Sequence, residues 1–132
     1  MILLPHAIRF ALRANSMTAR IRAERGQRFD PTPVLKLFNP LGAATWIATE
    51  LDEDDDSLFG LADLGFGCPE LGSFSLREIA AIRLPFGLGI ERDLGFAPLQ
   101  PLSVWAETAR RSGSLLQAEI ELLRATDEPR DT

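Results

Sequence analysis

The chain has 132 residues, which is the size of one ordinary domain and leaves little room for a second. Hydrophobic residues make up 45% of it, enough to fill a core, so a wholly disordered chain is excluded. One cysteine and one histidine exclude an internal disulfide, a multi-cysteine zinc site and a histidine-rich metal site, and the net charge of −5 works against broad contact with phosphate backbones.

The N-terminal part predicts a helix and then a basic loop. Apolar residues recur at helical spacing around Pro5, which suits a first turn, so we expect a helix from Leu3 to about Thr18. Residues 19–33 are polar and end in a proline-rich turn, which is typical of a loop. Six arginines and a single acid, Glu24, precede Asp30. The arginines are Arg9, Arg13, Arg20, Arg22, Arg25 and Arg28.

Three short strands are predicted next, because β-branched, aromatic and aliphatic residues run between turn signals. They span residues 34–38, 44–51 and 58–64. An Asn-Pro-Leu-Gly turn separates the first two, and the acidic loop 52–57 separates the second from the third. Connections this short favour an antiparallel meander over crossover units.

The segment after the third strand is less regular. Residues 65–72 are glycine-rich and are predicted to be irregular. Ser75 and Glu78 have the spacing of a capping box, which predicts a short helix to about Arg83. Residues 90–96 are compatible with a fourth strand of the sheet.

Two helices are predicted at the C-terminal end. Ser103 is placed to cap a helix that runs to about Arg111, and Ser114 has capping-box spacing before a helix over 115–125. The apolar stripe expected on this last helix is Leu115, Leu116, Ile120 and Leu123. The fold class is therefore α+β, with one domain over 1–125 and a frayed tail over 126–132.

Several runs together resemble a bacterial family labelled domain of unknown function 2958, over nearly all of residues 1–112. The quoted runs are Lys36-Leu37-Phe38, Thr45-Trp46, Glu50-Leu51-Asp52, Phe59 to Gly65, Gly67 to Gly72, Ser75-Leu76 and Ile90 to Asp93. The resemblance implies a genomic setting on plasmids and integrative conjugative elements, near replication, transfer and anti-restriction genes. It brings no catalytic residues with it, and it does not extend to 113–132.

Four aspartates in and after the acidic loop are spaced like the ligands of a calcium-binding loop, but other residues that such a loop needs are missing. Asp52, Asp54, Asp56 and Asp63 fall at positions 1, 3, 5 and 12. Position 6 is Ser57 where a sharp turn needs glycine, position 12 lacks the bidentate glutamate, and the flanking segments are predicted strands. We therefore expect a solvated hairpin loop whose like charges keep a sheet edge soluble, and no bound metal.

A catalytic carboxylate pair is not favoured either. Pairing Leu51 with Leu58 places Glu50 opposite Phe59, and it places Asp63 opposite Trp46. The two acids are then roughly 13 Å apart at about 3.3 Å per residue, whereas glycosidase pairs lie within about 10 Å. Asp63 is instead expected to bond to backbone amides of the glycine-rich loop or to an arginine.

The remaining reactive or aromatic side chains favour structural roles. Cys68 has no base beside it in sequence, and His6 lies in a different element, so a packed thiol and a first-turn helix residue are expected. Trp46 and Trp105 are expected in the core. Gly65-x-Gly67 is followed by Pro69-Glu70, which does not suit a phosphate loop, so no cofactor is expected.

The favoured function is a small, non-catalytic protein-binding accessory protein of a mobile genetic element. Its contact surface would combine the hairpin 50–58 with the loop 65–74, through Asp52, Glu53, Asp54, Asp55, Asp56 and Glu70. One version is a counter-defence inhibitor, of the anti-CRISPR or anti-restriction kind. There the carboxylates occupy an arginine- and lysine-lined groove of a host defence nuclease or CRISPR complex.

Two alternatives stay open. A metal-assisted hydrolase or transferase would use Glu50, Asp52, Asp63 and Glu70. Nucleic-acid binding through the arginine-rich residues 9–28 is the second alternative. The oligomeric state is left open as well. The apolar runs are too short to span a membrane, and Met1–Leu4 is interrupted too soon to act as a secretory signal, so a reducing, cytoplasmic setting is expected.

Overall fold

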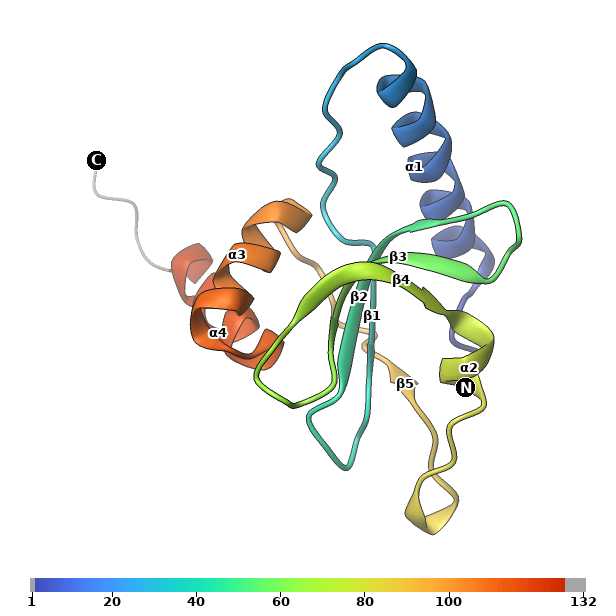
Figure 1. The fold of residues 1–132 in the computed structure, drawn as a ribbon. Coiled ribbons are helices and arrows are strands. Elements are labelled where there is room, and N and C mark those ends of the chain that lie inside the picture. Colours follow the sequence, from blue (N-terminus) through green and yellow to red (C-terminus); the bar gives the residue numbers. More distant parts are fainter. Residues whose placement is uncertain (1, 128–132) are drawn as a thin grey trace.

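The computed structural model describes residues 2–127, and within them a central antiparallel sheet lies between two layers of helices (Figure 1). The strands are β1 (Leu35–Phe38), β2 (Thr45–Leu51), β3 (Ser57–Asp63), β4 (Glu70–Ser75) and β5 (Glu91–Arg92). The helices are α1 (His6–Glu24), α2 (Leu76–Ala80), α3 (Leu102–Ser112) and α4 (Leu115–Asp127), with a 3-10 turn at Pro85–Gly87. The α+β class predicted from the sequence is confirmed.

The sheet contains more than the predicted meander. Its strand order is β4-β3-β2-β1-β5, so the expected three-stranded meander lies at the centre. Residues 90–96 contribute only the two-residue strand β5, which pairs with β1. The glycine-rich segment does not stay irregular, because residues 70–75 form β4 against β3. Glycine and serine lower strand propensity, but pairing with a formed neighbour overrides that preference.

A bulge in β2 changes the predicted register. Glu50 lies opposite Phe59, as expected, but Ala48 lies opposite Gly60, so Thr49 is the extra residue. Asp63 therefore pairs with Thr45 and not with Trp46. The carbonyl that the bulge frees is satisfied by α1, since the Asn15 side-chain amide donates to Thr49 O at 2.9 Å. Two residues earlier on α1, the Arg13 guanidinium donates to Leu51 O at 2.9 Å.

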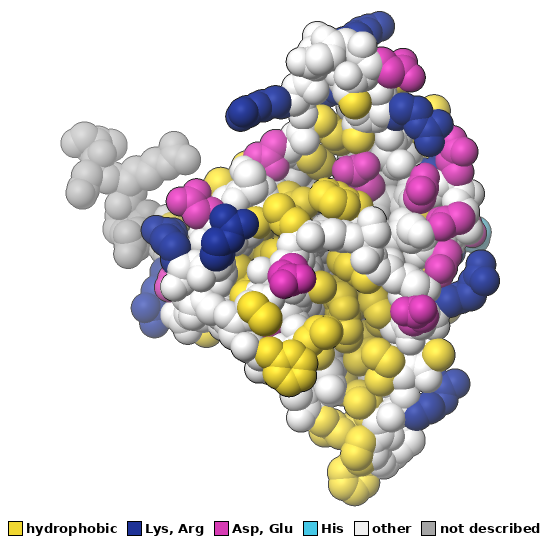
Figure 2. Space-filling view, viewed as in Figure 1, with side chains coloured by type: hydrophobic (Ala, Val, Ile, Leu, Met, Phe, Trp, Pro, Cys, Tyr) yellow, Lys and Arg dark blue, Asp and Glu magenta, His cyan; other side chains and the backbone are white. Residues whose placement is uncertain are grey.

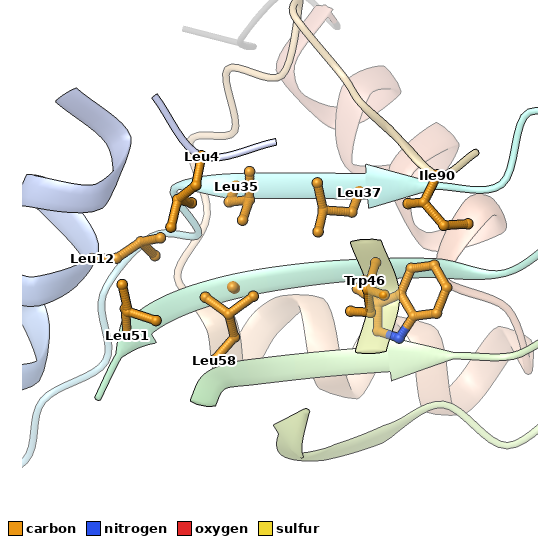
Figure 3. Packing of buried hydrophobic residues seen from close by; sticks show 10 residues of the cluster. Leu4, Leu12, Leu35, Leu37, Trp46, Leu51, Leu58 and Ile90 are labelled. Atoms are coloured by element: carbon orange, nitrogen blue, oxygen red, sulfur yellow. The ribbon is translucent and has the colours of Figure 1, made fainter. Parts of the chain in front are cut away.

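Two hydrophobic clusters cover the two faces of the sheet. The first, shown in Figure 3, packs α1 and α2 against one face. Its fully enclosed members include Leu12, Leu35, Leu37, Leu51 and Leu58. The second packs α3 and α4 against Ile47 and Leu61 on the opposite face. Trp46 lies in the first cluster and Trp105 in the second, so both tryptophans are in the core as predicted.

The helix boundaries differ from the predictions for identifiable reasons. The first helix starts at His6 and runs on to Glu24, because the arginines and alanines that follow Thr18 are good helix formers. The helix α2 begins after Ser75, whose hydroxyl accepts from Glu78 N, and it ends at Ala80, short of Arg83. The predicted N-cap of α2 is thus confirmed.

At the C-terminal helices, one predicted cap is confirmed and one is wrong. The Ser114 hydroxyl accepts from Gln117 N at 3.1 Å, as predicted for the start of α4. Ser103 lies inside α3, and its backbone amide donates instead to the carboxylate of Asp30 at 3.0 Å. A residue 73 positions away therefore caps α3, which no local pattern reveals.

The predicted apolar stripe of α4 is also wrong, because the helix is rotated so that only part of it faces the core. Leu115 and Ala118 are enclosed, while Leu116, Ile120 and Leu123 are 38%, 46% and 55% exposed. The helix continues through Asp127, so the first two residues of the predicted tail are helical, and 128–132 lie outside the described residues. No helix in the described part of the chain has the length and apolar character that crossing a bilayer requires.

Candidate functional site

The acidic loop between β2 and β3 is held between α1 and α2. Asp55, at its tip, forms an ion pair with Arg9, and Glu53 pairs with Arg20 at 2.6 Å. On the other side, the Asp56 carboxylate accepts from the Ser75 hydroxyl and from Arg77 N, both at 2.8 Å. Figure 2 shows an edge of the molecule where acidic side chains gather, with basic side chains above and below them. The loop therefore has a fixed shape.

Within the loop, Asp54 organises the turn. Its carboxylate accepts from Asp56 N at 2.9 Å and from Ser57 N at 2.8 Å, and it also binds the Ser57 hydroxyl. These hydrogen bonds, the one from the Ser57 hydroxyl above all, lower the pKa of Asp54 to about 2. Hydrogen bonds from Arg77 N and Ser75 lower the pKa of Asp56 as well. Both carboxylates are ionised at neutral pH.

A cleft of about 390 Å³ opens beside this loop, between the second half of α1 and the sheet. From the sheet, Glu50 and Phe59 face it as cross-strand neighbours. Asp52 lines it from the loop and Arg20 from α1, and three hydroxyl side chains complete the wall. These hydroxyls belong to Ser16, Ser57 and Ser73.

The electrostatics of the cleft are set by two carboxylates. Partial burial, and then the charge of Asp52, raise the pKa of Glu50. Arg20 lies at the rim, but its guanidinium already donates to Glu53, whose hydrogen bond and charge raise the pKa of Arg20. The interior is thus acidic and has one aromatic wall, which suits a cationic group.

Glu70 and Asp63 lie away from the loop. Glu70 pairs with Ala62 at the start of β4, whereas Ser57, at the loop, pairs with Ser75 at its end. The two ends are separated by five residues of strand, or roughly 17 Å. Glu70 therefore lies at the far end of the β3–β4 pair from the acidic loop, and a contact surface that joins the two stays a prediction.

Asp63 has the structural role that the sequence favoured. It is 3% exposed, and its two oxygens accept from Gly65 N and Leu115 N, each at 2.8 Å. Of the two predicted kinds of partner, the backbone amides are the ones present. Asp63 thus does not join Asp52, Asp54 and Asp56, and residues 2–127 contain no cluster of three potential metal-ligating side chains.

The arginine-rich segment is mostly turned toward the protein itself. Arg9, Arg13 and Arg20 bind the β2–β3 loop or the end of β2. Arg22 stacks on Phe29 with 5.6 Å from guanidinium carbon to ring centroid. Residues 9–22 thus form the helical support of the acidic loop, and nucleic-acid binding through residues 9–28 stays a prediction.

Of the two remaining reactive side chains, one is placed as predicted. His6 is the first residue of α1. Cys68 is exposed, so the prediction of a packed thiol is wrong. It falls in the turn between β3 and β4.

Sequence reasoning missed the partners of the loop and the contents of the cleft. Arg9 and Arg20 are 46 and 33 residues from the acids they bind, and the extension of α1 to Glu24 is what brings Arg20 there. A helical register carried past Thr18 would have placed Arg9, Arg13 and Arg20 on one face, because they are spaced at four and seven residues. Nothing in the sequence around Phe59 indicated more than an aromatic residue in a strand, so its place in the cleft could not be predicted.

The fold and the cleft define a small α+β domain with a rigid acidic hairpin and a cation-compatible cleft beside it. The chain belongs to the family described as proteins of unknown function DUF2958, whose model matches residues 3–116. This confirms the resemblance drawn from the sequence. Neither the curated proteins nor the solved structures contain a match to the chain.

Proposed function

We propose that the protein is a non-catalytic binding module that recognises a basic surface of another protein. The observation that carries the proposal is the cleft beside the β2–β3 loop, in which Glu50 and Asp52 lie with Phe59. An arginine or lysine side chain of the partner would meet two carboxylates and lie against an aromatic ring. Such a side chain is the cationic group that the cleft fits.

The ion pairs within the loop support this choice of partner. Glu53, Asp55 and Asp56 each have an arginine within 4 Å, so their charges are largely compensated. Asp52 and Asp54 have no such ion pair among the described residues, and Asp54 stays ionised because its pKa is about 2. The free negative charge is therefore concentrated at the cleft and at the adjoining turn.

The contacts that hold the loop favour binding through a preformed surface. Contacts from α1, α2 and the turn hold the carboxylates before any partner arrives, which lowers the entropy cost of association. Complementary charge also speeds encounter with a basic surface. We place this module among the accessory proteins of a mobile genetic element, and the basic surface in the nucleic-acid groove of a host nuclease or CRISPR complex.

The test is affinity purification of the tagged protein from its own host, followed by mass spectrometry. The double variant Glu50→Gln/Asp52→Asn removes the charge of the cleft, and Glu107→Gln on the exposed surface of α3 is the matched control. We expect a partner with a basic surface, bound by the wild type and the control and lost by the double variant. The interaction should also weaken as salt rises.

The contrary results are equally definite. A partner retained by the double variant, or one indifferent to salt, would show that the cleft is not the contact. Recovery of nucleic acid without protein would favour the arginine-rich segment instead. A product formed only with Mg²⁺ or Mn²⁺ would favour the hydrolase or transferase alternative.

A further inference from the structure

The sheet ends on β4, the strand that runs directly into α2 (Figure 1). Its six residues pair with β3 without a bulge, and they contain one charged residue, at the first position, and no lysine or proline. Natural proteins usually protect an edge strand with lysine, proline, a bulge or a very short length. The strand at the other edge, β5, has only two residues. Strand β4 is therefore the edge with the length and composition to pair with one more strand.

One hydrogen bond shows which backbone groups of β4 face away from β3. Leu76 N donates to Asp56 O at 2.9 Å. This pair continues the β3–β4 register by one step, since Ser57 lies opposite Ser75. Hydrogen-bonded and non-bonded pairs alternate along an antiparallel ladder, so Ser57 and Ser75 are a non-bonded pair. The backbone of Ser75, and of every second residue before it in β4, is therefore directed away from β3.

The outward-facing residues of β4 are Leu71, Ser73 and Ser75. The carbonyl of Ser75 is the N-cap carbonyl of α2, which accepts the first hydrogen bond of the helix. Outside the ladder, the backbone groups of Leu71 and Ser73 make no hydrogen bond with another backbone group among the described residues. The outer side of β4 thus offers N–H donors at all three residues and carbonyl acceptors at Leu71 and Ser73.

We propose that β4 pairs antiparallel with β4 of a second copy of this chain, about a twofold axis at Ser73. Such an axis is normal to the sheet, so Ser73 lies opposite the partner's Ser73 and Leu71 lies opposite the partner's Ser75. The two Ser73 residues exchange two N–H···O bonds. In each direction, Ser75 N donates to the partner's Leu71 O. The outward-facing residues are symmetric about Ser73, so the strand edge is complementary to itself.

Charge complementarity selects a second copy as the occupant of this edge. Side chains alternate along a strand, so Glu70 projects from the same face as Phe74, which packs in the cluster that contains Ile79 of α2. In the proposed register, Glu70 lies opposite the partner's Leu76 and next to the partner's Arg77. Glu70 is exposed, and the Arg77 side chain is 84% exposed. One ion pair between these two residues would therefore close each end of the paired strands.

The first test is sedimentation equilibrium of the full-length chain in about 0.15 M salt, at protein concentrations from about 10 µM to about 1 mM. The contact is small, so we expect a weak dimer with a dissociation constant of about 100 µM. The average mass should rise from near 14.5 kDa toward twice that value as the concentration increases. A mass that stays at 14.5 kDa at the highest concentration would overturn the proposal.

Charge reversal tests the ends of the contact. Glu70→Arg and Arg77→Glu each place like charges opposite one another twice in the dimer, so each should weaken it about tenfold. The double variant Glu70→Arg/Arg77→Glu restores opposite charges and should recover most of the affinity. Glu107→Arg makes the same change of charge on the exposed surface of α3 and should leave the dimer unchanged. Equal losses in Glu70→Arg and Glu107→Arg, or no recovery in the double variant, would refute the register.

Amide exchange with water, measured by NMR, locates the paired residues. Ser73 N–H faces the partner, so its exchange should be about fourfold slower at about 1 mM protein than at about 20 µM, as the monomer fraction falls. Gly72 N–H is bonded to β3 in either state, and its exchange should not depend on concentration. A dimer in which Ser73 exchanges equally fast at both concentrations would place the contact elsewhere and contradict the proposal.

Discussion

The Asp63 carboxylate and the Leu115 backbone amide join the end of β3 to the first turn of α4. The hydrogen bond is 2.8 Å long and links residues 52 positions apart, and the second Asp63 oxygen holds the turn at Gly65. A negative charge at a helix N-terminus is also favourable. This side chain therefore ties the start of α4 to the end of β3.

Replacing Asp63 with asparagine should destabilise the protein by about 2–3 kcal/mol. Asparagine keeps one side-chain oxygen for two backbone donors, and its NH₂ group is directed at the other amide. Urea unfolding at neutral pH measures the loss, and Glu107→Gln should stay within about 0.5 kcal/mol of the wild type. An Asp63→Asn variant as stable as this control would contradict the role assigned to the carboxylate.

Gly60 and Gly72 are cross-strand neighbours that should lose very different amounts of stability on the same substitution. A Cβ on Gly60 would lie 1.9 Å from Ile47 O, beside the Thr49 bulge, whereas one on Gly72 meets nothing within 4 Å. We expect Gly60→Ala to cost about 3 kcal/mol or more, because backbone must move. Gly72→Ala should change stability by less than about 1 kcal/mol. Equal midpoints of thermal unfolding for the two variants would argue against the register of β2 and β3.

Lys36 is a buried ammonium whose two acidic partners lie on different elements. Its Nζ lies 3.2 Å from Asp93 and 2.9 Å from Glu119, and the side chain is 8% exposed. Lys36→Met and Glu119→Gln should each destabilise the protein. In a double-mutant cycle the two changes should couple by about 1–3 kcal/mol. Strict additivity would mean that this ion pair does not hold α4 to β1.

The acidic loop should make stability depend on pH in the acid range. The pKa of Asp54 is lowered to about 2 in the folded protein, below its value in the unfolded chain. Its contribution is therefore fully present above the unfolded pKa near 4 and is lost as pH falls toward 2. Unfolding midpoints at pH 5, 3 and 2 should fall more steeply for the wild type than for Asp54→Asn, and parallel curves would contradict the turn geometry.

Local sequence patterns determined the fold class and the central meander. The strands around 35–38, 45–51 and 57–63 and the caps at Ser75 and Ser114 depend on side chains near them in the chain, so periodicity and spacing identify them. The same locality explains the prediction for Asp63, since the Gly65 amide that it binds lies two residues away.

The tertiary structure alone decided the contacts between distant residues. The pairing of β4 with β3, the Thr49 bulge and the capping of α3 by Asp30 each depend on a partner brought near by the rest of the fold. The charge of the acidic loop is the clearest case. In the sequence the loop is a run of five acidic residues, but helix α1 brings Arg9 and Arg20 to two of them in the fold. Long-range packing therefore determines which carboxylates remain available to a partner, because compensation of a charge depends on distance in space and not on distance along the chain.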